Sequence, residues 1–342
     1  MKFAPALDLR PRLFKKVPHK MKKIMQTVTW FIILLFTQSC SQDVQPLVIG
    51  FWNVENLFDM VDDPNKNDDE FAVGGRKKVT PEIYRLKLKN SAEVLADLDA
   101  DVVGLCEVET EAVLKDLNDA YPGRDYAIIH YESPDERGID NGLLYDPKKL
   151  KVISSRAIRN DLPKGDKTRD ILYVKGEYGG ETIHIFINHW PSNYGGREKA
   201  IPKRAATAAR IAKEISNISR KDADAEIILL GDFNEDPDEM NVQSLKTVGL
   251  SSLMEPMLGQ SKIGTYVYRG EDLFYDQIII HESLRDQQGL AIDPESVYIL
   301  DLPKYRQQEG DYAHYPFRFW AGNNLLGGYS DHLAVRVNII KK

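Results

Sequence analysis

The residues best suited to chemistry stand where apolar segments of this 342-residue chain end. The stretch 227–237 reads IILLGDFNEDP, in which an apolar run is followed by polar side chains at alternating positions, namely Asp232, Asn234 and Asp236. This pattern is typical of a buried strand that ends at a functional rim. Taken alone, it is equally compatible with a strand followed by an Asx turn, because Gly-Asp and Asn near Pro are common turn sequences.

Other apolar segments end or begin with polar residues in the same way, at Asn53, Glu107, Asn188 with His189, Asp276, and Asp331 with His332. Each residue has a structural explanation on its own, such as a turn cap, an ion pair or a hydrogen-bonded core histidine. Together they are costly to bury, and no comparable excess of Arg or Lys lies beside them in sequence. A hard divalent cation would supply the missing positive charge, and this ligand set favours Mg²⁺ or Mn²⁺ over structural zinc.

The segments that carry these residues alternate between strand and helix patterns. Helices are expected from the N-cap Thr80, at 111–120 and at 202–219. Strands are expected at 47–53, 101–107, 126–131, 141–145, 171–177, 182–188, from 227, and at 275–280, 296–300 and 332–339. No internal repeat or long Gly, Ser or Pro linker interrupts residues 47–342, so a single layered α/β domain is the economical interpretation.

Residues 1–40 form a separate segment. A short basic head begins at Met21, and an apolar run of ten residues at 27–36 precedes Cys40. The run is too short for a membrane span and has the length of a signal-peptide hydrophobic region. The signal is complete from Met21 onward, so the first twenty residues are interpreted as a misassigned start or an extended head. Residues 41–46 are a polar tether.

The end of this segment resembles the lipobox of a bacterial lipoprotein, whose cysteine is lipidated and becomes the mature N-terminus. The resemblance implies lipidation of Cys40, export, and a membrane anchor in the periplasm or at the outer membrane or cell surface. Thr37 departs from the large aliphatic residue that is usual in that box. A plain secretory signal that is cleaved nearby is the alternative.

Removal of residues 1–40 leaves 37 basic and 51 acidic residues, a net charge of −14. A surface this acidic excludes general binding of polyanions by counterion release, so a nucleic-acid substrate must be held locally with the help of a metal. Cys106 is the only cysteine after Cys40, which excludes a disulfide within residues 41–342. Its apolar surroundings predict a small core residue.

Six motifs follow one another along the chain: FWNVEN at 51–56, VVGLCE at 102–107, NHWPS at 188–192, GDFN at 231–234, YDQII at 275–279 and SDH at 330–332. In this set and order, residues 47–340 resemble the endonuclease/exonuclease/phosphatase superfamily. That superfamily includes deoxyribonuclease I, abasic-site endonucleases, bacterial sphingomyelinases and inositol polyphosphate 5-phosphatases. The resemblance implies a four-layered α-β-β-α sandwich in which two mixed β-sheets face each other, helices lie outside, and the site forms where strand ends meet.

The resemblance also implies roles in the hydrolysis of a phosphoester. Glu107 would be the principal metal ligand, with Asn53 and Asp331 near the metal or its waters. Asp232 would orient or deprotonate the attacking water, and Asn234 would hold that water and a phosphate oxygen. Asp236 then remains a turn residue that shapes the rim.

The remaining roles concern the phosphate. His332 would bind the scissile phosphate with its ring fixed by Asp276, and His189 would contact phosphate or act as the acid for the leaving group. Arg169 falls where relatives often carry a phosphate-binding arginine, although the residues after it differ from theirs. Arg137 and Asp140 resemble a pair near the substrate groove. Charge neutralisation by these groups and activation of water by Asp232 fit in-line attack without a covalent intermediate.

The substrate class is less defined. An inositol 5-phosphatase would carry a different motif in place of residues 272–277 (DLFYDQ), and residues 53–59 and 137–145 look most like secreted nucleases. The first interpretation is therefore an exported, metal-dependent nuclease that acts on nucleic acid as a monomer.

Two alternatives remain. The acidic surface favours a phosphodiesterase or phosphatase for small or lipid substrates, similar to sphingomyelinase. A non-catalytic surface-binding lipoprotein would be expected to lack at least one motif residue, and none is missing. The aromatic stretch 312–320 could stack on bases, touch a membrane, or pack over the sheet edge.

Overall fold

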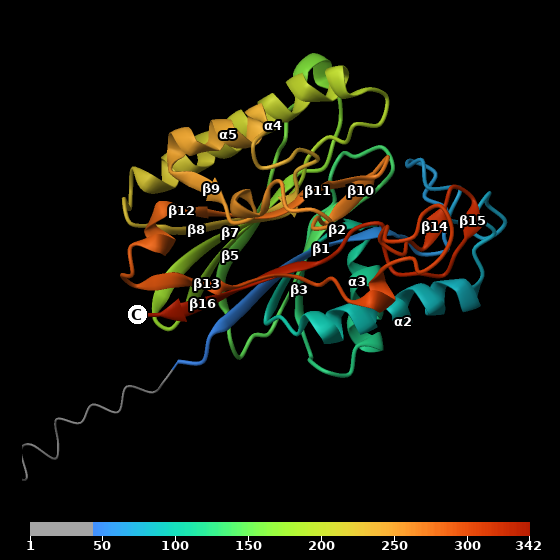
Figure 1. Cartoon of the computed structure of the whole chain (residues 1–342), viewed down its shortest axis with the longest axis horizontal. Helices are drawn as coiled ribbons and strands as arrows, with labels where there is room; N and C mark the ends of the chain where they lie inside the picture. The colour runs from blue at the N-terminus through green and yellow to red at the C-terminus, as the bar shows by residue number, and fades with distance from the viewer. Residues whose placement is uncertain (1–43) are drawn as a thin grey trace, which may run out of the picture. The chain divides into compact units, whose positions relative to one another are not determined.

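The structure is a computed structural model that describes residues 44–342 (Figure 1). The predictions for the signal segment, for Cys40 and for residues 41–43 of the tether lie outside the described residues. Gln45–Lys342 form one compact unit. Within residues 44–342, no helix has both the length and the apolar character needed to cross a membrane.

Two six-stranded mixed sheets form the centre of this unit. The first sheet has the order β13 (Leu290–Ile299), β16 (Val335–Lys341), β1 (Leu47–Leu57), β2 (Val102–Val108), β4 (Asp140–Tyr145) and β3 (Ala127–His130). The second has the order β5 (Lys151–Ile158), β6 (Ile171–Tyr178), β7 (Glu181–His189), β8 (Glu226–Asp232), β12 (Asp276–His281) and β9 (Leu250–Ser252). In each sheet one parallel pair, β1 with β2 or β7 with β8, lies among antiparallel neighbours.

Helices cover the outer faces of the two sheets, as Figure 1 shows. α2 (Pro81–Leu98) and α3 (Glu111–Ala120) pack on the first sheet, and α4 (Arg197–Ser219) and α5 (Met240–Ser244) pack on the second. Two small ribbons, β10 (Tyr266–Tyr268) with β11 (Glu271–Leu273) and β14 (Trp320–Ala321) with β15 (Asn324–Leu325), extend from the loops. Short 3-10 turns are η1 (Pro163–Gly165), η2 (Leu245–Val248), η3 (Glu255–Met257), η4 (Glu282–Arg285) and η5 (Pro303–Tyr305). The predicted four-layered sandwich is confirmed.

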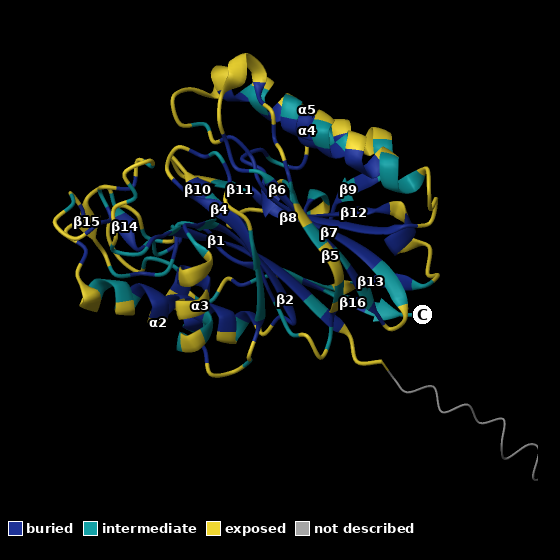
Figure 2. Ribbon diagram, turned by 180° about the vertical axis from the view of Figure 1, so that it is seen from behind, coloured by how far each residue is buried: buried dark blue, intermediate teal, exposed yellow. Residues whose placement is uncertain are grey.

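Strand alternation explains why the central strands are apolar on both faces. In β8, Ile228 and Leu230 point into the core between the sheets, whereas Ile227 and Leu229 pack under α4. A strand with two buried faces reads as a continuous apolar run. Figure 2 shows the central strands buried and the outward surface of α4 exposed. Cys106 is fully buried in the core between the sheets, as predicted.

The predicted start of α2 is confirmed, because the side chain of Thr80 accepts a hydrogen bond from the backbone N–H of Ile83 at 3.3 Å. The predicted start of α4 at Pro202 is wrong. The helix begins at Arg197 and contains Pro202, so this proline marks no boundary. Proline is common in a first turn because it lacks the N–H that has no partner there, and that preference misplaced the start.

The sequence interpretation also missed β5, whose mostly exposed edge position leaves no clean alternation of polar and apolar residues. β13 begins at Leu290 rather than at 296, and its pairing with β16 shifts register between Asp293 and Tyr298. A bulge of this kind interrupts the two-residue period on which strand prediction relies.

Candidate active site

Strand alternation carries several motif side chains into the space between the sheets. Asp232, the last residue of β8, continues the inward-facing positions of Ile228 and Leu230. Asp276 of β12 pairs directly across from Asp232 on one side, and His189 of β7 pairs with it on the other. Directly paired residues share a face of the sheet. The second sheet therefore presents three ionisable groups side by side at one end.

Glu107 of the first sheet reaches the same space through a break in the pattern. The register of β2 against β4 shifts after Cys106, and Glu107 has a φ of 62°. Such a bulge re-aims a side chain, and positive φ at a residue other than glycine is uncommon. Asn56 (φ 56°) and Asn234 (φ 51°) share this conformation. Left-handed residues gathered at strand ends are typical of functional sites.

Asp232 lies at the centre of the resulting contacts. Its Oδ2 accepts a hydrogen bond from Nδ2 of Asn53 at 3.1 Å and lies 3.6 Å from Nε2 of His189 and 3.9 Å from Nε2 of His332. Its Oδ1 accepts a hydrogen bond from the backbone N–H of Asn234 at 2.9 Å. Burial raises the pKa of Asp232 to about 7, against the opposing charge of His332. A carboxylate with such a pKa is suited to accept a proton near neutral pH.

His332 is fixed on the side of its ring that faces away from Asp232. Its Nδ1 lies 2.7 Å from Oδ2 of Asp276, and Tyr266 stacks on its ring with the centroids 4.6 Å apart. Burial alone would lower the pKa of His332, but the carboxylates of Asp276 and Asp232 together hold it well above its usual range. The two carboxylates therefore favour the imidazolium form of His332.

His189 lies on the opposite side of Asp232 in a different environment. Its Nε2 is 3.9 Å from Oε1 of Glu107, and its buried Nδ1 has no hydrogen-bond partner within residues 44–342. Burial, reinforced by the charges of Arg169, Arg137 and His332, holds the pKa of His189 well below its usual range. This environment therefore favours the neutral imidazole form of His189.

The donor set around Glu107 fits a hard divalent cation. Oε2 of Glu107 accepts the backbone N–H of Asn56 at 2.9 Å, whereas within residues 44–342 the only hydrogen bond to Oε1 is the long one from the amide of Asn53 at 3.5 Å. Asp331 borders the same pocket, and its Oδ2 pairs with Arg318 at 2.9 Å. Burial raises the pKa of Asp276, as it does that of Asp232, so the charged forms of both carboxyl groups are costly to hold here and a bound cation would stabilise them. Carboxylate and amide oxygens are the ligands that Mg²⁺ and Mn²⁺ prefer.

The structure places Arg169 behind the pocket. Its guanidinium donates to the backbone carbonyl of Trp190 at 2.8 Å and lies 3.4 Å from Oδ2 of Asp135. Arg137 lies near the site and donates to Oδ1 of Asn56 at 3.4 Å, whereas Asp140 is fully buried and accepts the backbone N–H of Ser133. Arg137 and Asp140 thus have separate partners.

Sequence reasoning missed a layer of charged residues behind Asp331. Glu55 accepts the backbone N–H groups of Phe319 and Trp320 at 2.6 and 3.0 Å, and burial raises its pKa to about 7. Lys87 is buried in α2, where it donates to the backbone carbonyl of Val54 at 2.5 Å, and burial lowers its pKa to about 8. Glu55 stands within the FWNVEN motif, which was the available signal. Lys87 had none, because a lysine in a helical pattern indicates a solvent-facing position.

The aromatic stretch 312–320 divides into two parts. Phe319 and Trp320 are buried in a cluster with Phe58 and Phe71, so the packing interpretation is confirmed for them. Tyr312 is 61% exposed.

A pocket of about 870 Å³ extends from these groups over the second sheet. Its lining includes the motif residues Glu107, His189, Asp232, Asn234, Asp331 and His332. Tyrosines, further acids and one arginine also line it: Tyr194, Tyr266, Tyr268, Tyr275, Asp236, Glu239, Glu271 and Arg197. Arg197 is paired with Glu239 at 2.7 Å. Asp236 accepts the backbone N–H of Phe274 at 2.6 Å, which agrees with its expected role in shaping the rim.

The fold and the cluster of carboxylates, imidazoles and amides at its strand ends define a phosphoesterase of the deoxyribonuclease I-like class. Residues 48–341 match the sequence model of the endonuclease/exonuclease/phosphatase family, and the chain belongs to that family. It is a hydrolase of phosphate esters. No curated protein matches the chain.

Solved structures with the same fold include an endonuclease/exonuclease/phosphatase family protein of Bacteroides thetaiotaomicron, with 18% identity, a TM-score of 0.56, and coverage of 87% of this chain and 96% of that one. A mannosyl-6-phosphatase from the same organism has 17% identity and a TM-score of 0.54, with 86% and 99% covered. D. rerio TDP2, complexed with a single-strand DNA product, has 16% identity and a TM-score of 0.55, with 86% and 99% covered. These likenesses support the fold.

Proposed function

We propose that the protein hydrolyses phosphoesters by in-line attack of a water molecule that Asp232 activates. The arrangement that carries this proposal is Asp232 between a charged His332 and a neutral His189. Mg²⁺ or Mn²⁺ bound by Glu107, with Asn53 and Asp331 nearby, would neutralise charge on the phosphoryl oxygens. Asp232 takes the proton of the attacking water.

Asn234 and His332 position the phosphate. Asn234 donates through Nδ2 to the carbonyl of Trp190 at 3.2 Å, which holds the amide beside Asp232, where it orients the attacking water and a phosphate oxygen. The imidazolium of His332, oriented by Asp276, binds the scissile phosphate, since a fixed positive charge stabilises the charge that develops in the transition state.

His189 acts as a hydrogen-bond donor to phosphate, because a neutral imidazole gives up its proton less readily than an imidazolium. The leaving oxygen takes its proton from solvent as its bond to phosphorus breaks. Arg169 does not line the pocket, so it acts through its bond to the carbonyl of Trp190, next to His189. The motifs alone favour a nuclease, whereas the charge of the pocket wall favours a small phosphoester.

The pocket supports the alternative of a small phosphoester. Besides the motif residues its wall carries Asp236, Glu239 and Glu271, and its one arginine, Arg197, is already paired. A second phosphate would meet negative charge there, whereas tyrosines suit an uncharged ring. The geometry therefore favours one phosphate attached to a neutral ring, such as a sugar or nucleoside, over a nucleic-acid duplex. The related folds include both a sugar phosphatase and a protein that binds single-strand DNA, so the fold does not separate these classes.

A substrate panel tests this conclusion. Plasmid DNA, a single-stranded oligonucleotide, RNA, sphingomyelin, sugar and inositol phosphates and an aryl phosphodiester are compared with Mg²⁺, Mn²⁺ or chelator. We expect hydrolysis of phosphates on neutral rings, lost with chelator. Efficient cleavage of duplex DNA would return the nuclease to first place, and cleavage of sphingomyelin alone would indicate a lipid enzyme.

A charge variant refines the panel. Glu271→Gln should lower the KM for the oligonucleotide and leave the KM for a neutral-ring monoester unchanged, because it removes repulsion at the pocket wall. Glu295→Gln, which alters an exposed acid outside the pocket, is the control.

We also propose export with a lipid anchor at Cys40, and a monomeric state. Metabolic labelling with a fatty acid should mark the wild type and not Cys40→Ala. Labelling of neither protein would favour the plain secretory signal.

A further inference from the structure

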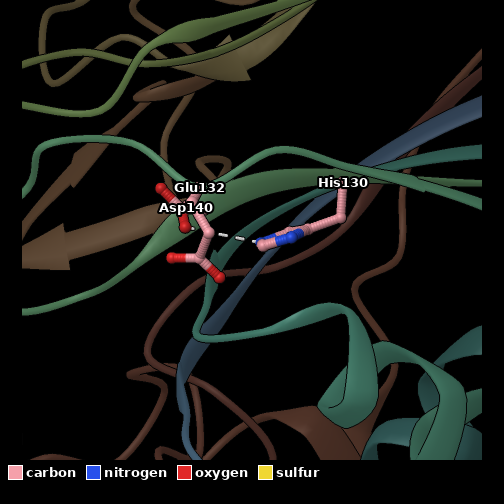
Figure 3. Close-up of side chains that lie close together, drawn as sticks. All are labelled: His130, Glu132 and Asp140. Atoms are coloured by element: carbon pink, nitrogen blue, oxygen red, sulfur yellow. Dashed lines mark ion pairs between the residues drawn. The ribbon is translucent and has the colours of Figure 1, made fainter. Parts of the chain in front are cut away.

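Another group of metal-ligating side chains lies outside the pocket, on the hairpin of β3 and β4. His130 ends β3, Asp140 begins β4, and Glu132 follows His130 by two positions (Figure 3). The antiparallel register pairs His130 with Gly142, so its continuation places Glu132 across from Asp140. Residues two apart on a strand share a face and are diagonal neighbours across the pair. One ligand atom from each of the three side chains accordingly lies within 4.8 Å of the other two.

Two of these ligand atoms are buried without hydrogen-bond partners. Neither Nε2 of His130 nor Oδ2 of Asp140 has one within residues 44–342, although the side chains are only 3% and 1% exposed. The other oxygen of Asp140 accepts the backbone N–H of Ser133 at 2.9 Å. An unpartnered carboxylate oxygen is costly to bury, so this pair of atoms indicates a ligand between them.

The separation of the two atoms fits ligation of a cation. Nε2 of His130 and Oδ2 of Asp140 are 3.4 Å apart, whereas a charge-assisted hydrogen bond is about 2.7–2.9 Å long. Two ligands that each lie about 2.1 Å from a tetrahedral ion are about 3.4 Å from each other.

We propose that His130, Glu132 and Asp140 bind a divalent transition-metal ion, Zn²⁺ or Mn²⁺, at a site distinct from the catalytic pocket. One imidazole with two carboxylates suits these ions better than Mg²⁺ or Ca²⁺, which prefer oxygen ligands alone. None of the three residues lines the pocket.

The ion would fix the loop 131–139, because its ligands stand at both ends of that loop. The loop carries Asp135, the partner of Arg169, and Arg137, which donates to Asn56. The site is thus structural, and it stabilises a loop that supports the catalytic pocket from behind.

Metal content of the intact protein tests this site. The protein is dialysed against Zn²⁺ or Mn²⁺ with excess Mg²⁺, which competes at the catalytic pocket, and bound metal is measured by mass spectrometry. The wild type should keep one Zn²⁺ or Mn²⁺ per chain. Glu132→Gln, an exposed substitution that spares the core, and His130→Gln should each weaken binding at least about tenfold.

Two variants serve as controls. Glu136→Gln changes an exposed acid in the same loop and should bind like the wild type. Glu107→Gln alters the catalytic pocket and should also retain the ion, so failure of the catalytic proposal is distinguishable from failure of this one. Zn²⁺ should raise the Tm of the wild type and of Glu136→Gln, but not that of Glu132→Gln.

Three results would overturn the proposal: equal metal binding by Glu132→Gln and Glu136→Gln, loss of the ion in Glu107→Gln alone, or a folded wild type that retains no ion. The last result would identify the cluster as an ion pair between His130 and Asp140.

Discussion

The two imidazoles that flank Asp232 belong to one site, but their pKa values are shifted in opposite directions. His332 has a carboxylate partner at 2.7 Å, and its pKa lies well above the usual range. His189 has no partner for Nδ1 among the described residues, lies near Arg169 and Arg137, and has a pKa well below the usual range. Burial is common to both, so the neighbouring charges decide the difference. Identical side chains can therefore take different parts in one reaction.

The largest loss of kcat is expected on substitution of Asp232, the carboxylate between the two histidines. Asp232→Asn removes the proton acceptor, and we expect kcat to fall at least about 100-fold while the Tm and circular dichroism show an intact fold. Asp236→Asn is the matched control, since it changes a pocket carboxylate but preserves an acceptor for the backbone N–H of Phe274. Near-normal turnover by Asp232→Asn would remove the basis of the mechanism.

Substitutions of the two histidines test the comparison directly. His332→Gln keeps a hydrogen-bonding side chain but loses the positive charge, so kcat should fall about 100-fold. His189→Gln replaces one neutral hydrogen-bond donor by another, so kcat should fall about tenfold. Steady-state kinetics on one substrate measures both. Equal losses, or a larger loss for His189→Gln, would contradict the assignment of the charge to His332.

The motifs were sufficient to name the members of this cluster and, through the pairing of Asp276 with His332, to predict that His332 favours its protonated form. They did not indicate the pKa shifts of His189 and Asp232. The pattern of an apolar run followed by a polar residue predicted four site residues at strand ends: Asn53, Glu107, His189 and Asp232. The apolar run indicates a buried strand, and the polar residue at its end can line a rim. Their facing positions follow from the pairing of distant strands, such as Asp276 with Asp232. That pairing, and hence the sign of the pKa shifts of His189 and Asp232, depends on contacts that no local pattern encodes.

The positions of Glu107 and Arg169 depend on features that no local pattern encodes. Glu107 enters the site only because the chain bulges after Cys106. The contacts of Arg169 with Asp135 and with the carbonyl of Trp190 join segments that are distant in sequence, whereas its expected role at the phosphate stays a prediction. Both outcomes depend on tertiary contacts.

Substitution of Asp276, the partner of His332, tests why the two histidines differ. Its effect on kcat should be smaller than that of His332→Gln. In Asp276→Asn the pKa of His332 falls, because the largest charge that raises it is gone. We expect a loss of about tenfold in kcat at pH 8 that shrinks toward pH 6, where His332 is protonated again. The pH profile of kcat distinguishes this role from a structural one, which would lower the rate by the same factor at every pH.

The smallest expected effect concerns stability, and its sign is opposite for the two residues. Because folding raises the pKa of His332, its contribution is complete below about pH 6.5, the unfolded value, and is lost as the pH rises through the folded value. Because folding lowers the pKa of His189, its contribution is present above about pH 6.5 and is lost as the pH falls toward the folded value.

Urea unfolding of the metal-free protein at pH 5, 7 and 9 measures both contributions to the free energy of unfolding. His189→Gln should reduce the change in the free energy of unfolding between pH 5 and 7 by roughly 1 kcal/mol. His332→Gln should reduce the change between pH 7 and 9 by roughly the same amount. The same change in both variants would mean that the two imidazoles titrate alike, and the contrast between them would be lost.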